Sequence, residues 1–284
     1  MFTRRRRQVK AFGGTVPLAR KNGRIWRPRM KLRAADVERT LIGMLTPSSN
    51  TVLEPYTAFL LHDLFPSVTA HFGRFHVTEI SLGDASRSQF ELEPLLAAAE
   101  QLADARVDVI AWNGTSASWL GFDRDEVLCR AITERTGVPA TSAILALNEL
   151  LQKTGVRRLG LVTPYVAEVQ ELIIANFRAI GIDTVAEERL GITDNFAFSE
   201  VSEQQLVAMC REVARARPDA IAIVCTNMRG SLIVPELERE LGIPIHDSVA
   251  FTLWKALAVA GVSTVPLRRW GGPFAVGGGK TGTG

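Results

Sequence analysis

Cys225 is the side chain whose type and position best suit proton-transfer chemistry. It ends the apolar run that begins at Ala220 and is followed by the polar pair Thr226-Asn227. At a strand end with a helix expected to start next, backbone N–H groups and the helix dipole would lower the pKa of the thiol. Such a thiol exchanges a proton near neutral pH, which makes Cys225 the candidate catalytic residue. The alternative is a buried packing cysteine, a common role of this residue.

Small polar residues follow each of the four apolar runs that predict strands. In parallel α/β sheets ligands bind beyond the carboxyl ends of the strands, so these residues are expected to meet at one site. They form four short segments: Thr46-Pro-Ser-Ser-Asn50, Asn113-Gly-Thr-Ser116, Thr163-Pro-Tyr165 and Cys225-Thr-Asn227.

The hydroxyl and amide groups of these segments can donate hydrogen bonds to anionic oxygens. Thr115 and Ser116 offer hydroxyls and backbone donors at a strand-to-helix turn, and Ser48 to Asn50 do the same in the first loop. Clusters of this kind suit the oxygen pair of a carboxylate or an enediolate, and helix capping is their alternative role. Tyr165 is one of two tyrosines. Its phenol is expected either to point into the same cleft or to pack in the core.

The remaining cysteines and the histidines form no recognisable site. Cys129 and Cys210 lie among apolar neighbours in segments of helical period, which predicts core positions. Three widely spaced cysteines argue against a disulfide framework or a zinc cluster. No metal-ligand spacing and no Ser-His-Asp order involves the four histidines, which are His62, His71, His76 and His246.

Apolar runs alternate with longer segments of helical period, which predicts an α/β fold with right-handed crossovers. Buried parallel strands are predicted at Leu41–Thr46, Val107–Trp112, Leu159–Thr163 and Ala220–Cys225. Helices are predicted at Glu91–Ala105, Asp125–Arg135, Ile144–Lys153, Glu168–Ile180, Glu203–Ala216 and Ala250–Ala260.

An internal repeat indicates that the chain consists of two similar halves. Three landmarks recur in the same order: Leu41 to Pro47 resembles Leu159 to Pro164, Val107 to Ala111 resembles Pro218 to Ala222, and Thr136 to Pro139 resembles Leu241 to Pro244. Within this repeat Gly114 corresponds to Cys225. One half therefore offers a thiol at the end of a strand, and the other half offers no side chain there.

The repeat predicts two pseudo-symmetric α/β domains, with mainly parallel sheets flanked by helices and the site in the cleft between them. We expect the first at about 40–145 and the second at about 146–262. These boundaries are approximate, because a helix near 250–260 is also able to pack back on the first half. Outside them we expect a basic, disordered extension over 1–39 and a flexible Gly-rich tail over 263–284.

Charge is distributed unevenly along the chain. The net charge is +3, but twelve Lys or Arg and no Asp or Glu lie within the first 33 residues, so the rest is acidic. Nucleic-acid binding by this basic head is the least favoured reading, because no nucleic-acid-binding motif accompanies it. Translation starting at Met30 is a further hypothesis. No run long enough to span a membrane and no secretory signal is recognised, which predicts a cytoplasmic protein.

Several of these segments together resemble the aspartate/glutamate racemase superfamily, and within it the branch of maleate cis-trans isomerase and arylmalonate decarboxylase. The resemblance spans about Thr40 to Gly261. It rests on five motifs in order: Pro47-Ser-Ser-Asn-Thr51, Gly114-Thr-Ser116, Thr163-Pro-Tyr165, Gly191-Ile-Thr-Asp-Asn195 and Cys225-Thr-Asn227.

The resemblance implies a cofactor-independent enzyme with two pseudo-symmetric α/β domains, each contributing one catalytic position. Both positions are cysteines in the racemases and in maleate isomerase, whereas arylmalonate decarboxylase has glycine at the first, as Gly114 is here. It implies catalysis by Cys225, no metal, and a small carboxylic acid as substrate. The residues expected to hold the carboxylate or enediolate are Ser48, Asn50, Gly114, Thr115, Ser116, Tyr165, Asn195, Thr226 and Asn227.

The resulting hypothesis is decarboxylation of a malonate-like, α-substituted dicarboxylic acid, with Cys225 protonating an enediolate. The Pro47-Ser-Ser-Asn-Thr51 and Asn195 segments resemble maleate isomerase instead, so cis-trans isomerisation or a related racemase-type isomerisation is the alternative. A non-catalytic protein that binds small carboxylates is the third reading. A homo-oligomer is compatible with the sequence, and a membrane partner is not expected.

Overall fold

The computed structural model describes residues 20–21, 24–25, 39–80 and 92–276. The chain divides into two compact units, residues 1–37 and 38–284. In the first unit, β1 (Arg20–Lys21) pairs antiparallel with β2 (Arg24–Ile25). The rest of the extension expected over 1–39, apart from Arg39, lies outside the described residues. All that follows concerns the second unit.

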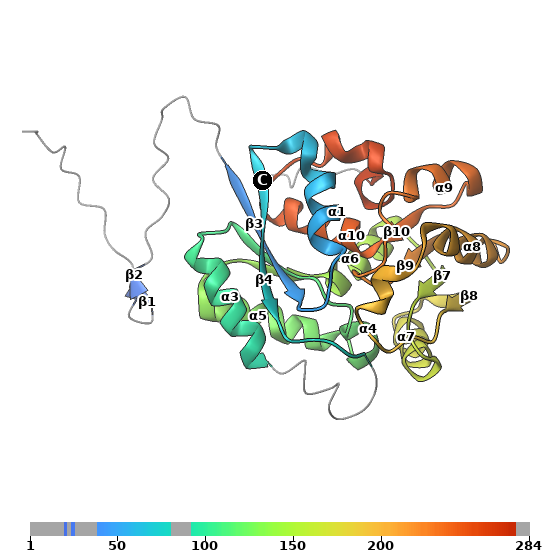
Figure 1. Cartoon of the computed structure of the whole chain (residues 1–284), viewed down its shortest axis with the longest axis horizontal. Coiled ribbons are helices and arrows are strands. Elements are labelled where there is room, and N and C mark those ends of the chain that lie inside the picture. Colours follow the sequence, from blue (N-terminus) through green and yellow to red (C-terminus); the bar gives the residue numbers. More distant parts are fainter. Residues whose placement is uncertain (1–19, 22–23, 26–38, 81–91, 277–284) are drawn as a thin grey trace, which may run out of the picture. The chain divides into compact units, whose positions relative to one another are not determined.

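Two four-stranded parallel sheets form the centre of the second unit (Figure 1). The first has the order β4-β3-β5-β6 and the second the order β8-β7-β9-β10, so the two sheets place corresponding strands in the same sequence. The strands of the first sheet are β3 (Thr40–Pro47), β4 (Val68–Phe75), β5 (Val109–Trp112) and β6 (Ala140–Ser142). Those of the second are β7 (Arg158–Thr163), β8 (Asp183–Arg189), β9 (Ala220–Ile223) and β10 (Ile245–Asp247).

Helices flank both sheets. Figure 1 shows α3 and α5 beside the first sheet and α7 and α8 beside the second. The α-helices are α1 (Leu53–Leu60), α3 (Leu92–Asp104), α4 (Ala117–Leu120), α5 (Asp123–Thr136), α6 (Ala143–Thr154), α7 (Ala167–Ala179), α8 (Glu203–Ala214), α9 (Val234–Leu241) and α10 (Ser248–Val259). Short 3₁₀ helices are η1 (Leu61–Leu64), η2 (Ala197–Glu200), η3 (Val265–Trp270) and η4 (Gly272–Ala275).

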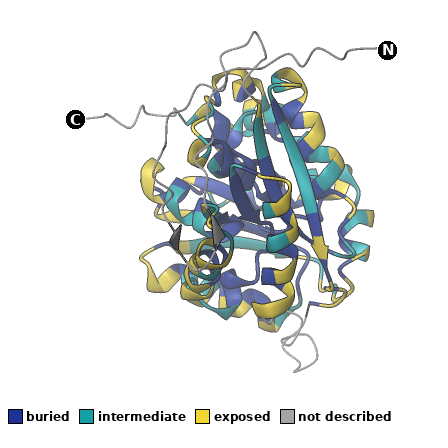
Figure 2. Cartoon of the chain, turned by 90° about the vertical axis from the view of Figure 1, so that its left-hand side faces the viewer, coloured by how far each residue is buried: buried dark blue, intermediate teal, exposed yellow. Residues whose placement is uncertain are grey.

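The predicted two-domain α/β fold is confirmed, and local chemistry explains its elements. The inner strands β5 and β9 are apolar throughout and fully buried, as expected for parallel strands covered on both faces. Polar side chains begin several helices: Ser142 caps α6 by accepting from the Leu145 N–H, and Asp247 caps α10. Figure 2 shows buried residues concentrated in the central strands and exposed residues on the outer helices.

Two expectations need correction. The strand predicted to reach Cys225 ends at Ile223, and the next helix, α9, begins only at Val234. The expected flexible tail is ordered from 263 to 276, where η3 and η4 bury Leu267 and Phe274 completely. Apolar side chains between the prolines and glycines supply the packing that the composition alone did not indicate. Residues 277–284 lie outside the described part.

The two halves contact each other at several places. α10 packs against α1, β5 and α6. The segment after β4 also meets the segment after β8, because the Ile80 N–H donates to the Thr193 carbonyl and the Asn195 N–H donates to the Thr78 carbonyl. These contacts fix the loops at the carboxyl ends of both sheets against one another. None of the helices in the described ranges is long and apolar enough to cross a membrane.

Candidate functional site

Gly114 and Cys225 occupy matching positions in the two halves. Gly114 lies two residues beyond the end of β5, and Cys225 lies two residues beyond the end of β9. β5 and β9 hold the same place in their sheets, each between the first strand of its half and the short edge strand. The pairing of these two positions expected from the repeat is therefore present in the structure.

A small cavity of about 20 Å³ lies between these strand ends. That volume holds about one water molecule, so a larger ligand must displace side chains of the wall. The polar part of the lining comes from Gly114, Thr115, Ser116, Tyr165, Asn195, Cys225 and Thr226. The apolar part comes from Pro47, Val77, Ile80, Trp112 and Trp119.

The Cys225 thiol is buried and mostly protonated. The residue is 3% exposed, and burial raises the pKa of its thiol to about 12. The Asn227 N–H, 3.4 Å from Sγ, and the Tyr165 hydroxyl oppose that rise by hydrogen bonding to the sulfur. Sequence reasoning expected a lowered pKa from a helix starting beside the thiol. Because α9 starts nine residues later, at Val234, that stabilisation of the thiolate is missing.

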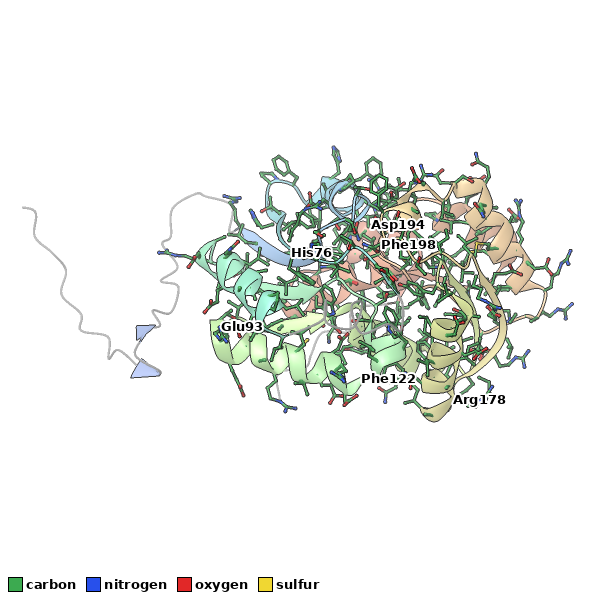
Figure 3. The ribbon with its side chains drawn as sticks, turned by 60° about the horizontal axis from the view of Figure 1, so that its bottom comes forward. His76, Glu93, Phe122, Arg178, Asp194 and Phe198 are labelled. Atoms are coloured by element: carbon green, nitrogen blue, oxygen red, sulfur yellow. The ribbon has the colours of Figure 1, made fainter. Side chains whose placement is uncertain are left out.

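Tyr165 connects the two halves at the cavity. Its hydroxyl lies 2.6 Å from the Thr115 hydroxyl oxygen and also hydrogen-bonds to the Cys225 sulfur. Complete burial raises the pKa of the phenol well above 10, so the group stays neutral and keeps its proton. The ring packs at 5.2 Å from Trp119 and 5.7 Å from Phe198, which Figure 3 labels. These ring contacts fix the direction of the hydroxyl.

Thr226 sits at the centre of a buried hydrogen-bond chain. Its hydroxyl donates to the Asn113 carbonyl at 2.8 Å and accepts from Asn50 Nδ2 at 3.1 Å. Asn50 in turn accepts from the N–H groups of Val52 and Leu53 at the start of α1. This chain ties the loop after β3 and the loop after β5 to the residue next to Cys225. It explains why Asn50 does not line the cavity.

Asn227 and Asn195 form a second chain. The Asn227 amide oxygen accepts from the Thr51 N–H at 3.0 Å, and its nitrogen donates to the Asn195 carbonyl at 2.5 Å. Asn195 Nδ2 donates to the Ser49 hydroxyl at 2.6 Å. The side-chain bonds of Asn227 are therefore used within the protein, whereas its backbone N–H faces the thiol. Asn227 acts on the site by positioning the loop that carries Cys225.

The two remaining serines of the expected set play different parts. Ser116 lines the cavity and immediately precedes α4. Ser48 does not line it: its hydroxyl accepts from the Val77 N–H at 3.1 Å and lies 3.3 Å from the Val77 carbonyl. Ser48 thus holds the loop after β3 against the segment after β4. Of the ten expected residues, Ser48, Asn50 and Asn227 are absent from the cavity wall.

The apolar wall was missed by sequence reasoning. The sequence predicts Trp112 only as the last residue of a strand, and it gives no signal that assigns Trp119 to the site. Val77 and Ile80 follow β4, a strand that the sequence reading did not identify. A partial signal was available, since Trp112 directly precedes the polar segment that starts at Asn113.

The other two cysteines stay away from this site. Cys129 lies in α5 and Cys210 in α8, both are buried, and burial raises the pKa of Cys210 to about 12. Within the described ranges, no three His, Cys, Asp or Glu side chains gather in a way that could hold a metal ion. The chemically reactive side chain at the cavity is thus the Cys225 thiol.

The fold and the cavity define a class of protein: two parallel α/β halves related by pseudo-symmetry, with one thiol between polar and apolar walls. The family model described as arylmalonate decarboxylase matches residues 63–267. The chain belongs to this family.

Curated relatives have two different activities. The chain is 29% identical over 225 residues to the arylmalonate decarboxylase of Bordetella bronchiseptica, covering 78% of this chain and 90% of the relative. It is 23% identical over 232 residues to the maleate isomerase of Geobacillus stearothermophilus, covering 78% and 92%. These relatives place the chain in the branch that contains both enzymes, as the sequence motifs predicted.

A solved structure supports the same fold. It is a cysteine-to-serine variant of the maleate cis-trans isomerase of Nocardia farcinica with a covalently bound succinylcysteine intermediate. The TM-score is 0.74 at 22% identity, and the match covers 81% of this chain and 98% of that chain.

Proposed function

We propose that the protein is a cofactor-independent decarboxylase of a malonate-like, α-substituted dicarboxylic acid, with Cys225 as the proton donor. The observation that supports this best is the composition of the cavity wall: one thiol, several hydroxyls and five apolar side chains. The hydroxyls suit a retained carboxylate. The apolar side chains suit an uncharged substituent and a carboxylate that leaves as carbon dioxide.

The protonation state of the thiol favours this role. With a pKa of about 12, Cys225 holds its proton at neutral pH and acts as an acid. Loss of carbon dioxide breaks the bond between the α-carbon and one carboxyl group and leaves its electron pair in an enediolate. That carbanion equivalent takes the S–H proton at the α-carbon. The resulting thiolate is stabilised by the Asn227 N–H and the Tyr165 hydroxyl and is reprotonated from solvent.

The developing charge on the retained carboxylate is stabilised by neutral donors. Thr115 and Tyr165 share a 2.6 Å hydrogen bond at the cavity, and Ser116 and Thr226 lie in the same wall. A carboxylate that enters accepts hydrogen bonds from some of these hydroxyls. Because the donors are already oriented by packing, little reorganisation accompanies the formation of the enediolate.

Maleate cis-trans isomerisation is the second candidate. It is favoured by the maleate isomerase relatives and by the succinylcysteine intermediate in the Nocardia farcinica enzyme. That route requires a thiolate to attack the double bond of maleate. A thiol of pKa about 12 is a poor source of thiolate, and Gly114 supplies no second thiol at the position that matches Cys225. These two points favour decarboxylation.

The test is an assay of carbon dioxide release and fumarate formation on a panel of α-substituted malonates and maleate. Wild type is compared with Cys225→Ala and with Cys129→Ala, a matched loss of a buried cysteine outside the cavity. We expect carbon dioxide from at least one malonate, retained in Cys129→Ala and lost in Cys225→Ala. Fumarate from maleate would replace the proposal with isomerisation. Binding of dicarboxylates without turnover would replace it with a binding protein.

The proposal includes a cytoplasmic location and is compatible with a homo-oligomer. Cell fractionation tests the first, and light scattering on the purified protein tests the second. The proposed chemistry requires neither a monomer nor an oligomer.

A further inference from the structure

The space for a side chain at position 114 is already filled. A Cβ atom built on Gly114 would lie 1.8 Å from Cζ2 of Trp112, 2.3 Å from Cε2 and 2.4 Å from Cη2. Cβ contacts below 3.0 Å are essentially never seen in proteins, so any residue other than glycine requires the indole to move. Gly114 is not among the glycines of positive φ. It is therefore the indole, and not an unusual backbone angle, that requires glycine.

The indole is not free to move. Trp112 is 1% exposed, and its ring lies 5.1 Å from the ring of Phe75. Its backbone ends β5 between two neighbouring strands, opposite Leu45 of β3 and Ser142 of β6. A rigid aromatic side chain held in this way does not yield as the end of a flexible chain would.

We propose that Trp112 restricts position 114 to glycine, and so keeps a second acid–base side chain from being accommodated at the position that matches Cys225. This inference rests on the proposed decarboxylation. Gly114 supplies no side chain, so only the face of the α-carbon that meets Cys225 has a thiol, and the indole of Trp112 presents an apolar ring at the matching position. The site then protonates one face and takes an uncharged, apolar α-substituent.

A second thiol at position 114 is expected to act in the site only when the indole of Trp112 is absent. Racemisation of an α-substituted acid needs a thiolate that removes the α-proton on one face and a thiol that returns a proton on the other. Because burial raises the pKa of Cys225 to about 12, Cys225 is expected to act as the thiol and the new sulfur at position 114 as the thiolate. Gly114→Cys supplies the second sulfur, but in wild-type packing its Cβ collides with the indole. Replacing Trp112 by leucine in the same chain removes the ring and opens that space. The two substitutions are therefore expected to depend on each other.

The first readout is thermal stability, which does not require any activity. Gly114→Ala and Gly114→Cys are each made in the wild-type protein and in the Trp112→Leu variant. The Tm of each single variant is compared with that of wild type, and the Tm of each double variant is compared with that of Trp112→Leu. In the presence of Trp112 each substitution is expected to lower Tm by about 4 °C or more. With Trp112→Leu the loss is expected to fall to less than half. Equal losses in both backgrounds would overturn the inference.

The second readout is loss of optical purity and uptake of solvent deuterium by a single-enantiomer α-aryl acid. Trp112→Leu/Gly114→Cys is expected to exchange the α-proton at least about tenfold faster than Gly114→Cys, as a newly placed acid–base group would allow. A Gly114→Cys protein that is as stable as wild type and racemises as fast as the double variant would contradict the inference.

The two proposals fail in distinguishable ways. If wild type decarboxylates nothing while the Tm losses still depend on Trp112, the proposed function fails and the exclusion by Trp112 stands. If wild type decarboxylates but the Tm losses are independent of Trp112, only the inference fails. If Gly114→Cys does not fold, the double variant Trp112→Leu/Gly114→Ala tests the inference instead. If this double variant also fails to fold while Trp112→Leu folds, a neighbour other than Trp112 requires glycine at position 114.

Discussion

The hydroxyl oxygens of Thr115 and Tyr165 lie 2.6 Å apart and are contributed by different halves of the molecule. Thr115 follows β5 in the first half and Tyr165 follows β7 in the second. The same tyrosine hydroxyl reaches the Cys225 sulfur. This arrangement brings a neutral donor pair next to the thiol, where the retained carboxylate of the proposed substrate would be bound.

Removal of the Tyr165 hydroxyl is expected to slow turnover without unfolding the protein. Tyr165→Phe keeps the ring contacts with Trp119 and Phe198 but loses the donor shared by Thr115 and Cys225. We expect kcat to fall on the order of a hundredfold, the effect of losing one preorganised donor. The measurement is steady-state kinetics, with Tm as the control for folding. A kcat within about twofold of wild type would remove Tyr165 from the mechanism.

The Thr226 hydroxyl is expected to stabilise the fold through Asn50. Thr226→Val has nearly the same shape but leaves Asn50 Nδ2 without its acceptor in a buried place. We expect the free energy of unfolding to drop by about 1–3 kcal/mol, measured by urea denaturation. Thr226→Ser restores the hydroxyl and is expected to recover most of the loss. A Thr226→Val protein that is destabilised no more than Thr226→Ser would contradict a stabilising role of the hydroxyl.

The Cys225 thiol is expected to stay protonated across the neutral range. Its pKa of about 12 leaves no more than a small thiolate fraction up to roughly pH 10. Ultraviolet thiolate absorbance is measured against pH in wild type and in Cys225→Ala. The difference between the two is expected to be negligible below roughly pH 10. A thiolate signal that develops near pH 7 would contradict the structure and restore the lowered pKa expected from sequence.

Asp125 is expected to make stability depend on pH. Burial raises the pKa of its carboxyl from 3.8 to about 7, despite hydrogen bonds from Ser142 and the Ile144 backbone. Between these values the folded protein binds more protons than the unfolded chain. The contribution of Asp125 to the free energy of unfolding is therefore fully present below about pH 4. It declines as pH rises to about 7, by an amount on the order of 4 kcal/mol.

The variant Asp125→Asn isolates this contribution. It cannot titrate at position 125, so its stability relative to wild type is expected to increase with pH over that window. Denaturant unfolding at several pH values measures the difference. His246, whose pKa is lowered to about 4 by burial, contributes with the opposite sign but equally in both proteins. A difference that does not change with pH would show that Asp125 is ionised in the folded state throughout.

Much of this architecture could be predicted from the sequence because its signals are local. The inner strands β5 and β9 are uninterrupted apolar runs, and α6 combines an apolar stripe with a Ser142 cap and a glycine after its last turn. The carboxyl ends of parallel strands meet at one edge of each sheet, so the polar segments that follow them could be assigned to one site without a structure.

Other features depend on contacts that are distant in sequence. The edge strands β4 and β8 are only partly buried and carry polar residues, which obscures their pattern. The pKa of Cys225 is raised chiefly by burial, which depends on how both halves enclose the thiol, and the turns between Cys225 and Val234 carry no clear sequence signal. Trp112 and Gly114 are close in sequence, but their contact depends on how Phe75 and the neighbouring strands orient the indole.

The most direct test of single-thiol decarboxylation is the isotopic and stereochemical outcome in heavy water. An α-alkyl-α-arylmalonate is converted by wild type, and the product is analysed by mass spectrometry and chiral chromatography. The account predicts one deuterium at the α-carbon, a single enantiomer, and a rate at least on the order of a hundredfold lower for Cys225→Ala. Racemic product, or undiminished decarboxylation by Cys225→Ala, would contradict proton delivery by this thiol.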